Sequence, residues 1–167
     1  IKEKVQNDLA VVKGELTSQD TDGWSTLINC ASSHIYLKQM NRICESALEN
    51  GAEPVRVLSS VLGQNYPSDE LEYSWKKLMQ NHPHDSICCC SVDEVQDEMA
   101  TRFNKSKQVA DYLVSEGTRY IADKINTKEY EKYKNALPFV VFNTTGRKRT
   151  SVVSVEIDVT RKSGWLK

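Results

Sequence analysis

The feature that most constrains the fold is a long run of helical periodicity over residues 91–125. Apolar residues recur there at steps of three and four, which places them on one face of an α-helix. They are Val92, Val95, Met99, Phe103, Ala110, Leu113, Val114, Gly117, Ile121 and Ile125. At the usual rise, about 35 residues give a helix roughly 50 Å long. Such a helix buries its apolar face only against other helices.

Its start is predicted from a capping box, Ser91-Val92-Asp93-Glu94. In this motif the Ser91 hydroxyl would accept from the amide of Glu94, and the Glu94 carboxylate would accept from the amide of Ser91. The helix is therefore expected to begin at Ser91.

Three shorter helices are expected before it. The apolar pattern of residues 25–50 predicts an amphipathic helix, which Gly51 would stop. A second helix is expected over residues 54–62, opened by Pro54 and closed by Gly63.

The third of these is expected to begin after Ser68 as its N-cap and to end near Asn81. Pro83 disfavours helical geometry at His82, which it follows. Helices of this kind pack as a bundle.

The period changes near the C-terminal end of the sequence. Residues 138–143 form a continuous apolar run, a turn is expected at residues 144–146, and residues 153–159 alternate between apolar and polar. These patterns predict two strands. The predicted fold is mainly α, a three-helix bundle followed by the first strands of a β-sandwich domain.

Composition excludes some partners. Lys plus Arg number 22 and Asp plus Glu 23 in 167 residues, so no overall field favours nucleic acid or an anionic membrane. No apolar run reaches the roughly 18 residues of a membrane span. The five cysteines form no regular framework, which predicts a reducing, cytoplasmic setting. Homo-oligomer formation is left open.

Two of the three histidines, one aspartate and three cysteines lie close together within residues 82–91. A neutral imidazole at His84 suits zinc, and Asp85 could orient a hydroxyl. A catalytic zinc takes about three protein ligands plus water, so this segment would be an incomplete site. The plainer interpretation, on residue types alone, is a loop whose His and Asp cap the flanking helices or face water.

The other members of the cluster give weaker signals. Cys88, Cys89 and Cys90 cannot all converge on one ion, and they are expected to be small buried apolar residues. His82 and His84 flank Pro83. Such a His-x-His pair can bind one metal ion, but a proline between the two also suits a plain turn. His34 is expected to be a surface histidine or a hydrogen-bonded one rather than a metal ligand.

Several motifs, in their order along the chain, resemble the central part of the family 38 glycoside hydrolases, the α-mannosidases. They are Gly14-Glu15-Leu16, then Ser33-His34-Ile35-Tyr36-Leu37-Lys38-Gln39, then the run from Trp75 to Ile87 that ends in His82-Pro83-His84-Asp85-Ser86-Ile87. The resemblance implies three parts. Residues 1–22 would end a catalytic α/β domain that is otherwise absent, residues 23–128 would form the middle helical domain, and residues 129–167 would begin the β domain.

The same resemblance implies roles for two residues. His84 would be the zinc ligand that the helical domain donates, and Asp85 would bind hydroxyls of an α-mannoside. The remaining zinc ligands, the nucleophile and the acid/base would come from the catalytic domain, so this segment alone would be inactive. The sequence departs from the family pattern at Cys89, where a glycine is expected, and at Gln96, where a histidine is common.

Two other functions fit the residues less well. A metal-dependent phosphohydrolase would use the His84–Asp85 pair with His34 and either Asp111 or Asp123, but such pairs lie on helices. A helical interaction module would use the long helix as a docking surface and need no metal.

Overall fold

The computed structural model describes residues 13, 32–130, 132–133 and 137–156. The chain divides into two compact units, Ile1–Ile125 and Asn126–Lys167. Each unit is considered by itself.

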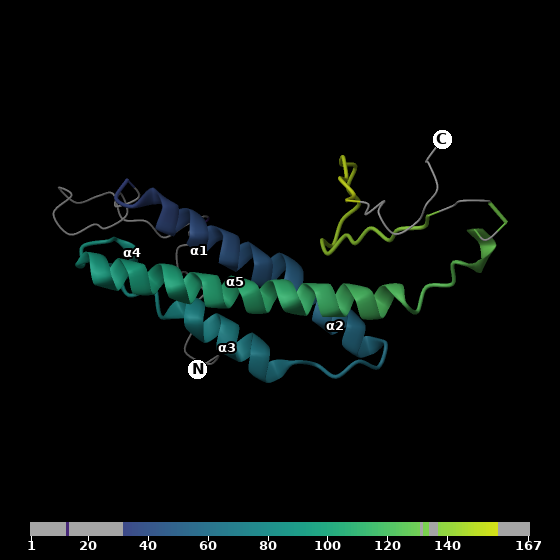
Figure 1. Ribbon diagram of the computed structural model, residues 1–167, viewed down its shortest axis with the longest axis horizontal. Coiled ribbons are helices and arrows are strands. Elements are labelled where there is room, and N and C mark those ends of the chain that lie inside the picture. The colour runs from purple at the N-terminus through teal and green to yellow at the C-terminus, as the bar shows by residue number, and fades with distance from the viewer. Residues whose placement is uncertain (1–12, 14–31, 131, 134–136, 157–167) are drawn as a thin grey trace, which may run out of the picture. The chain divides into compact units, whose positions relative to one another are not determined.

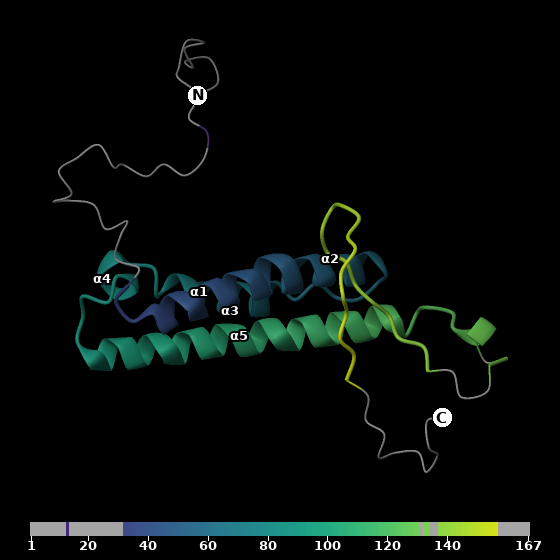
Figure 2. The same cartoon turned by 90° about the horizontal axis from the view of Figure 1, so that it is seen from above.

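The helical unit is organised around α5 (Asp93–Ala122), the long helix that the sequence predicts. α1 (Ile35–Ala47), α2 (Glu53–Val61) and α3 (Ser68–Met79) all pack against it. In the view of Figure 1 α1 lies above α5 and α3 below it, and Figure 2 shows that both run along the same side of α5. The described part of the chain is therefore mainly helical, as predicted.

Gly51 does not stop the first helix, contrary to the prediction. One turn of π-helix, η2 (Leu48–Ala52), joins α1 directly to α2, with the amide of Glu53 donating to the carbonyl of Leu48. Pro54, next in the chain, has no N–H to donate. In the π-helical turn, hydrogen bonds to the fifth preceding residue locally replace the α-helical bonds to the fourth. A Cβ at Gly51 would lie 3.1 Å from Val114 Cγ2, so this glycine permits close approach of α5.

The expected start at residue 25 lies outside the described residues. Residues 32–34 are not helical, and His34 has a left-handed backbone (φ 43°) before α1 begins. The end of α2 follows the prediction, because Gly63 has φ 98°, a conformation that glycine adopts without a Cβ clash.

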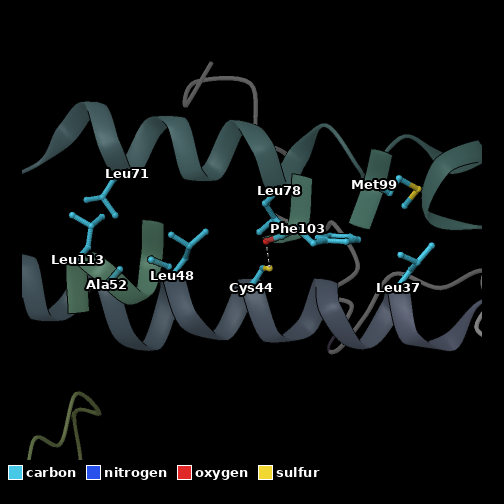
Figure 3. Packing of buried hydrophobic residues seen from close by; sticks show 10 residues of the cluster. Leu37, Cys44, Leu48, Ala52, Leu71, Leu78, Met99, Phe103 and Leu113 are labelled. Atoms are coloured by element: carbon cyan, nitrogen blue, oxygen red, sulfur yellow. Dashed lines mark hydrogen bonds between the residues drawn. The ribbon is translucent and has the colours of Figure 1, made fainter. Parts of the chain in front are cut away.

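The hydrophobic core fills the space between α1 with η2, α3 and α5. Its buried side chains come from α1, η2, α3 and α5, and Figure 3 shows them pointing toward one another. They are Leu37, Cys44, Leu48, Ala52, Leu71, Leu78, Met99, Phe103, Ala110 and Leu113. The last four lie on α5 and belong to the predicted apolar face.

Three buried polar side chains hydrogen-bond to carbonyl oxygens of α5. The Cys44 thiol donates to Phe103 O at 3.3 Å, Ser74 Oγ donates to Ser106 O at 2.9 Å, and Asn81 Nδ2 donates to Met99 O at 3.0 Å. The first of these is the dashed line in Figure 3. Directional bonds from both α1 and α3 fix how far each helix slides along α5.

The capping box at Ser91 does not form, so that prediction is wrong. α5 begins at Asp93 with Val92 as its N-cap, and no side-chain cap bond is present there. The Ser91 hydroxyl is buried and makes no hydrogen bond within the described residues. Instead, Gln96 Nε2 donates to the carbonyl of Ser91 at 3.0 Å, which fastens the entry into α5.

α3 begins at Ser68, but its N-cap is Pro67 rather than the predicted Ser68. Asp69 and Glu70 lie in its first turn, where carboxylates suit the positive end of the helix dipole. The helix ends at Met79, close to the predicted end.

The second unit contains a short 3-10 helix, η3 (Lys128–Tyr130). No strand forms within residues 137–156, and the end of the second predicted strand lies outside the described part. Two strands without further partners are marginal in water, which explains their absence. A bend does form near the predicted turn, where Asn143 Nδ2 donates to Arg147 O at 2.8 Å. Among the described residues no helix is long and apolar enough to cross a membrane.

Gly117→Ala should destabilise the helical unit. A Cβ there would lie 2.6 Å from Val55 Cγ1 and 3.1 Å from Arg56 Cδ, both on α2. The overpacking should cost about 1–3 kcal/mol, against about 1 kcal/mol gained from helix propensity. Thermal unfolding followed by circular dichroism should show a lower Tm.

The matched control is Gly146→Ala, because a Cβ at Gly146 meets no atom within 4 Å. A Tm for Gly117→Ala equal to or above that of the wild type would contradict the packing of α2 on α5.

Candidate functional site

The segment from His82 to Ser91 connects α3 to α5, and its centre is helical rather than a loop. α4 (His84–Ile87) is a single turn at the beginning of α5 (Figure 1). Pro83 precedes it with φ −48° and ψ 137°, and its ring fixes φ in the range from which a helix can start. The predicted loop is therefore corrected to one helical turn between two bends.

α4 presents His84 and Asp85 to solvent. Their side chains are 73% and 75% exposed, and His84 Nε2 lies 3.3 Å from Asp85 Oδ1. The pair can form a salt bridge only when the imidazole is protonated. A neutral His84 can turn the same nitrogen toward a metal, and the carboxylate can accept hydrogen bonds from hydroxyl groups.

The described residues alone do not form a metal site. They contain no group of three or more His, Cys, Asp or Glu side chains arranged to hold an ion. Zinc in proteins takes about three or four protein ligands, so His84 with Asp85 beside it does not make such a site. The structure does not gather His34, Asp111 or Asp123 around His84, as a phosphohydrolase site would require.

The end of α4 has the hydrogen bonds of a Schellman motif. The amide of Cys90 donates to Asp85 O at 3.1 Å and that of Cys89 to Ser86 O at 2.9 Å. Cys89 takes the left-handed position with φ 61°, where glycine is usual. A residue with a Cβ pays about 1–2 kcal/mol for this conformation. The departure from glycine noted in the sequence thus falls at the one strained position of the segment.

Two side chains of α1 contact this segment, and sequence reasoning assigned a role to neither. Lys38 Nζ donates to Cys89 Sγ at 3.1 Å and also to the carbonyl of Ser33. A hydrogen bond of 2.8 Å joins His82 Nε2 and Asn41 Oδ1. Lys38 belongs to the motif of residues 33–39 that carries the family resemblance, which was the signal in the sequence.

The three adjacent cysteines differ in exposure, which corrects the prediction that all are buried apolar residues. Cys88 is buried, Cys89 is half-buried and Cys90 is exposed. His82 is exposed and bonded to Asn41, so it contributes to the scaffold. His34 is exposed at the start of α1, as expected.

A surface pocket of about 380 Å³ lies away from this segment. Its walls include the α2–α3 connection, residues 64–67, and Tyr112, Leu113 and Glu116 of α5. These α5 residues are roughly 30 Å along the helix from its start beside α4. The pocket therefore has no part in the His84–Asp85 site.

The family model "Alpha mannosidase middle domain" matches residues 25–121, more than half of the chain. This chain belongs to the α-mannosidase middle domain family. The match contains all of the helical unit described above except the end of α5, and it contains α4 with His84 and Asp85.

Similar proteins support the family assignment. A protein of Halalkalibacterium halodurans named "Putative mannosylglycerate hydrolase" is 46% identical over 153 residues, which are 92% of this chain and 17% of that protein. An α-mannosidase from Enterococcus faecalis V583 of known crystal structure is 49% identical, with a TM-score of 0.63, over 75% of this chain and 14% of its own.

A second Enterococcus faecalis structure, of a protein in glycosyl hydrolase family 38, is 46% identical with a TM-score of 0.59. That match covers 61% of this chain and 12% of the second structure's chain. This chain thus spans less than a fifth of the length of each of these three relatives.

Cys44 and Cys90 should react very differently with iodoacetamide. Burial raises the pKa of the Cys44 thiol above its ordinary value, and only the thiolate is nucleophilic. In the native protein Cys90 should be alkylated first, whereas Cys44 should react only after denaturation or at a pH higher than an ordinary thiol needs. Peptide mass spectrometry of samples quenched over time measures both rates.

Equal rates for Cys44 and Cys90 in the native protein would contradict the packing of α1 on α5.

Proposed function

We propose that this chain is the middle helical part of a longer, retaining α-mannosidase-type glycoside hydrolase. In this proposal His84 is a zinc ligand and Asp85 binds hydroxyls of an α-mannoside. One observation carries it: within a domain of this family, α4 exposes an imidazole and a carboxylate side by side at one end of the helical bundle.

His84 suits the ligand role because its imidazole is accessible and sits on a helical turn. Its Nε2 must turn away from Asp85 to donate its lone pair to a metal. Zinc, when bound, supplies an electrostatic hold on the sugar's hydroxyl oxygens. A further His and two Asp ligands are proposed to come from a catalytic domain outside this chain, since no sufficient set lies among the described residues.

Asp85 suits the substrate role because an ionised carboxylate accepts hydrogen bonds from two hydroxyls at once. Such bonds fix the sugar ring relative to the reacting carbon, and they gain strength if they shorten in the transition state. The nucleophile and the acid/base of the retaining mechanism are proposed to lie outside this chain. The isolated chain should therefore be inactive.

The proposed domain division follows the family. Residues 1–22 would end the catalytic α/β domain, residues 23–128 would form the middle domain, and residues 129–167 would begin the β-sandwich domain. In the longer protein, strands at 138–143 and 153–159 would find the partners that two strands alone lack.

The substrate class is an α-mannoside, and the relative named for mannosylglycerate makes a glycerate-linked sugar one candidate. The exposed Cys90 thiol suits the reducing cytoplasm, where such a thiol persists.

His84→Ala in the full-length protein should remove bound zinc and hydrolysis of an aryl α-mannoside together. Loss of a residue that only supports a ligand costs about 10–100-fold in metal affinity, so loss of the ligand should cost at least about 100-fold. Metal analysis by mass spectrometry and the kcat/KM for the aryl mannoside provide the measurements.

His34→Ala is the matched control, because His34 is also exposed but lies outside α4. Full zinc content and full activity in His84→Ala would exclude the proposed role.

Asp85→Asn should lower kcat/KM about 10–100-fold while zinc content stays at the wild-type level. The substitution keeps the shape but removes the charge, and a hydrogen bond to a charged group is worth about 1.5–3 kcal/mol. Measuring kinetics and zinc content on the same preparation separates substrate binding from metal binding. Loss of zinc together with activity would reassign Asp85 to the metal.

A further inference from the structure

The exposed turn that carries His84 and Asp85 is fastened to the bundle on both sides by α1. Before α4, His82 Nε2 is hydrogen-bonded to Asn41 Oδ1 at 2.8 Å. After α4, Cys89 Sγ accepts from Lys38 Nζ at 3.1 Å. Lys38 and Asn41 are three residues apart, so they lie on one face of α1. One helix face thus holds both flanks of the turn.

α4 has little of its own to fix its direction. None of its four residues is buried, and only Ile87 packs against the core. A single turn with so few contacts is held mainly through its ends. The direction in which His84 projects therefore depends on how the residues before and after α4 are anchored.

The contact at Cys89 falls where the segment is strained. Cys89 has φ 61° without the freedom of glycine, and such a conformation persists when surrounding contacts over-determine it. Lys38 supplies such a contact. It is itself held, because its ammonium group also donates to the carbonyl of Ser33 in the turn before α1.

We propose that Lys38 is a positioning residue for the His84–Asp85 site, acting through Cys89, with Asn41 as a second anchor through His82. The inference rests on the proposed function and extends it. Lys38 keeps the turn after α4 in its left-handed conformation, and so holds His84 in one orientation toward the metal without touching the metal itself.

The test measures zinc affinity of the full-length protein, using zinc alone and a competing chromophoric chelator on metal-free protein. Lys38→Met keeps the length of the side chain but removes its donor. Zinc affinity should fall about 10–100-fold, the effect expected of a residue that orients a ligand. Lys38→Arg keeps a cationic donor and should stay within about threefold of the wild type.

Lys107→Met is the matched control. Lys107 is half-buried like Lys38 and bonds one partner, Asp111, but it lies within α5 and contacts no residue of the α4 segment by hydrogen bond or ion pair. Its replacement should leave zinc affinity unchanged. A loss equal to that of Lys38→Met would show a general effect on the bundle and overturn the proposal.

Cys89→Gly provides the decisive background. It relieves the left-handed strain and removes the sulfur through which Lys38 acts, so Lys38→Met should cause no further loss of zinc affinity there. A full additional loss in the double variant would overturn the proposal, because Lys38 would then act by another route.

A second measurement covers the case in which Lys38→Met fails to fold, as judged by circular dichroism. Asn41→Ala removes the other anchor and should weaken zinc binding several-fold, and unchanged affinity in that variant would overturn the proposal. Unchanged zinc binding in His84→Ala would instead disprove the proposed function. Loss of zinc in His84→Ala with unchanged affinity in a folded Lys38→Met would disprove only the present inference.

Discussion

The packing of α1 and α3 against the apolar face of α5 is the constraint on which the helical unit depends. Met99, Phe103, Ala110 and Leu113 provide the α5 part of the core, and α1, η2 and α3 bury their own apolar residues in the same cluster. Apolar burial drives this association but does not specify a unique axial position. Cys44, Ser74 and Asn81 supply that specificity, because each bonds one particular carbonyl of α5.

The same constraint places the candidate site. Asn81 anchors the chain after α3 to Met99 near the start of α5, and Gln96 holds the carbonyl of Ser91 where the chain enters α5. The segment between these two anchors is short, so it must project at the end of the bundle. α4 is exposed because both of its flanks are fixed to buried structure, while only Ile87 of the turn itself packs against the core.

Within the segment from His82 to Ser91, backbone strain lies at Cys89, on the flank of that turn. A glycine at position 89 would satisfy the Schellman geometry without cost, but this chain has a cysteine there and a lysine beside it. Exchanging backbone freedom for a specific side-chain contact favours one orientation of the turn. A binding site gains from that, since an orientation set in advance need not be fixed when the ligand binds.

Periodicity in the sequence predicted α5, α3 and the closure of α2 by Gly63, because apolar spacing and glycine preference act locally. It failed at Gly51 and Ser91. At Gly51 the sequence predicted the end of a helix, but in the structure this glycine instead allows close approach of α5. At Ser91 it predicted a capping box, but the side chain of Gln96 bonds the Ser91 carbonyl instead. The strands predicted after residue 137 did not form in the described part, since strands need partners that local pattern cannot supply.

For the site, the residue types made His84 and Asp85 candidates, and the family resemblance supplied the roles that are proposed for them. By itself the sequence determined which side chains have suitable chemistry, that a long helix must be covered by others, and that a proline would interrupt the chain before His84. Only the tertiary structure decided that Lys38 and Asn41, 51 and 41 residues away from their partners, would fasten this turn. Contacts across such separations depend on the axial register of packed helices, and spacing along one helix carries no information about where its neighbour will lie.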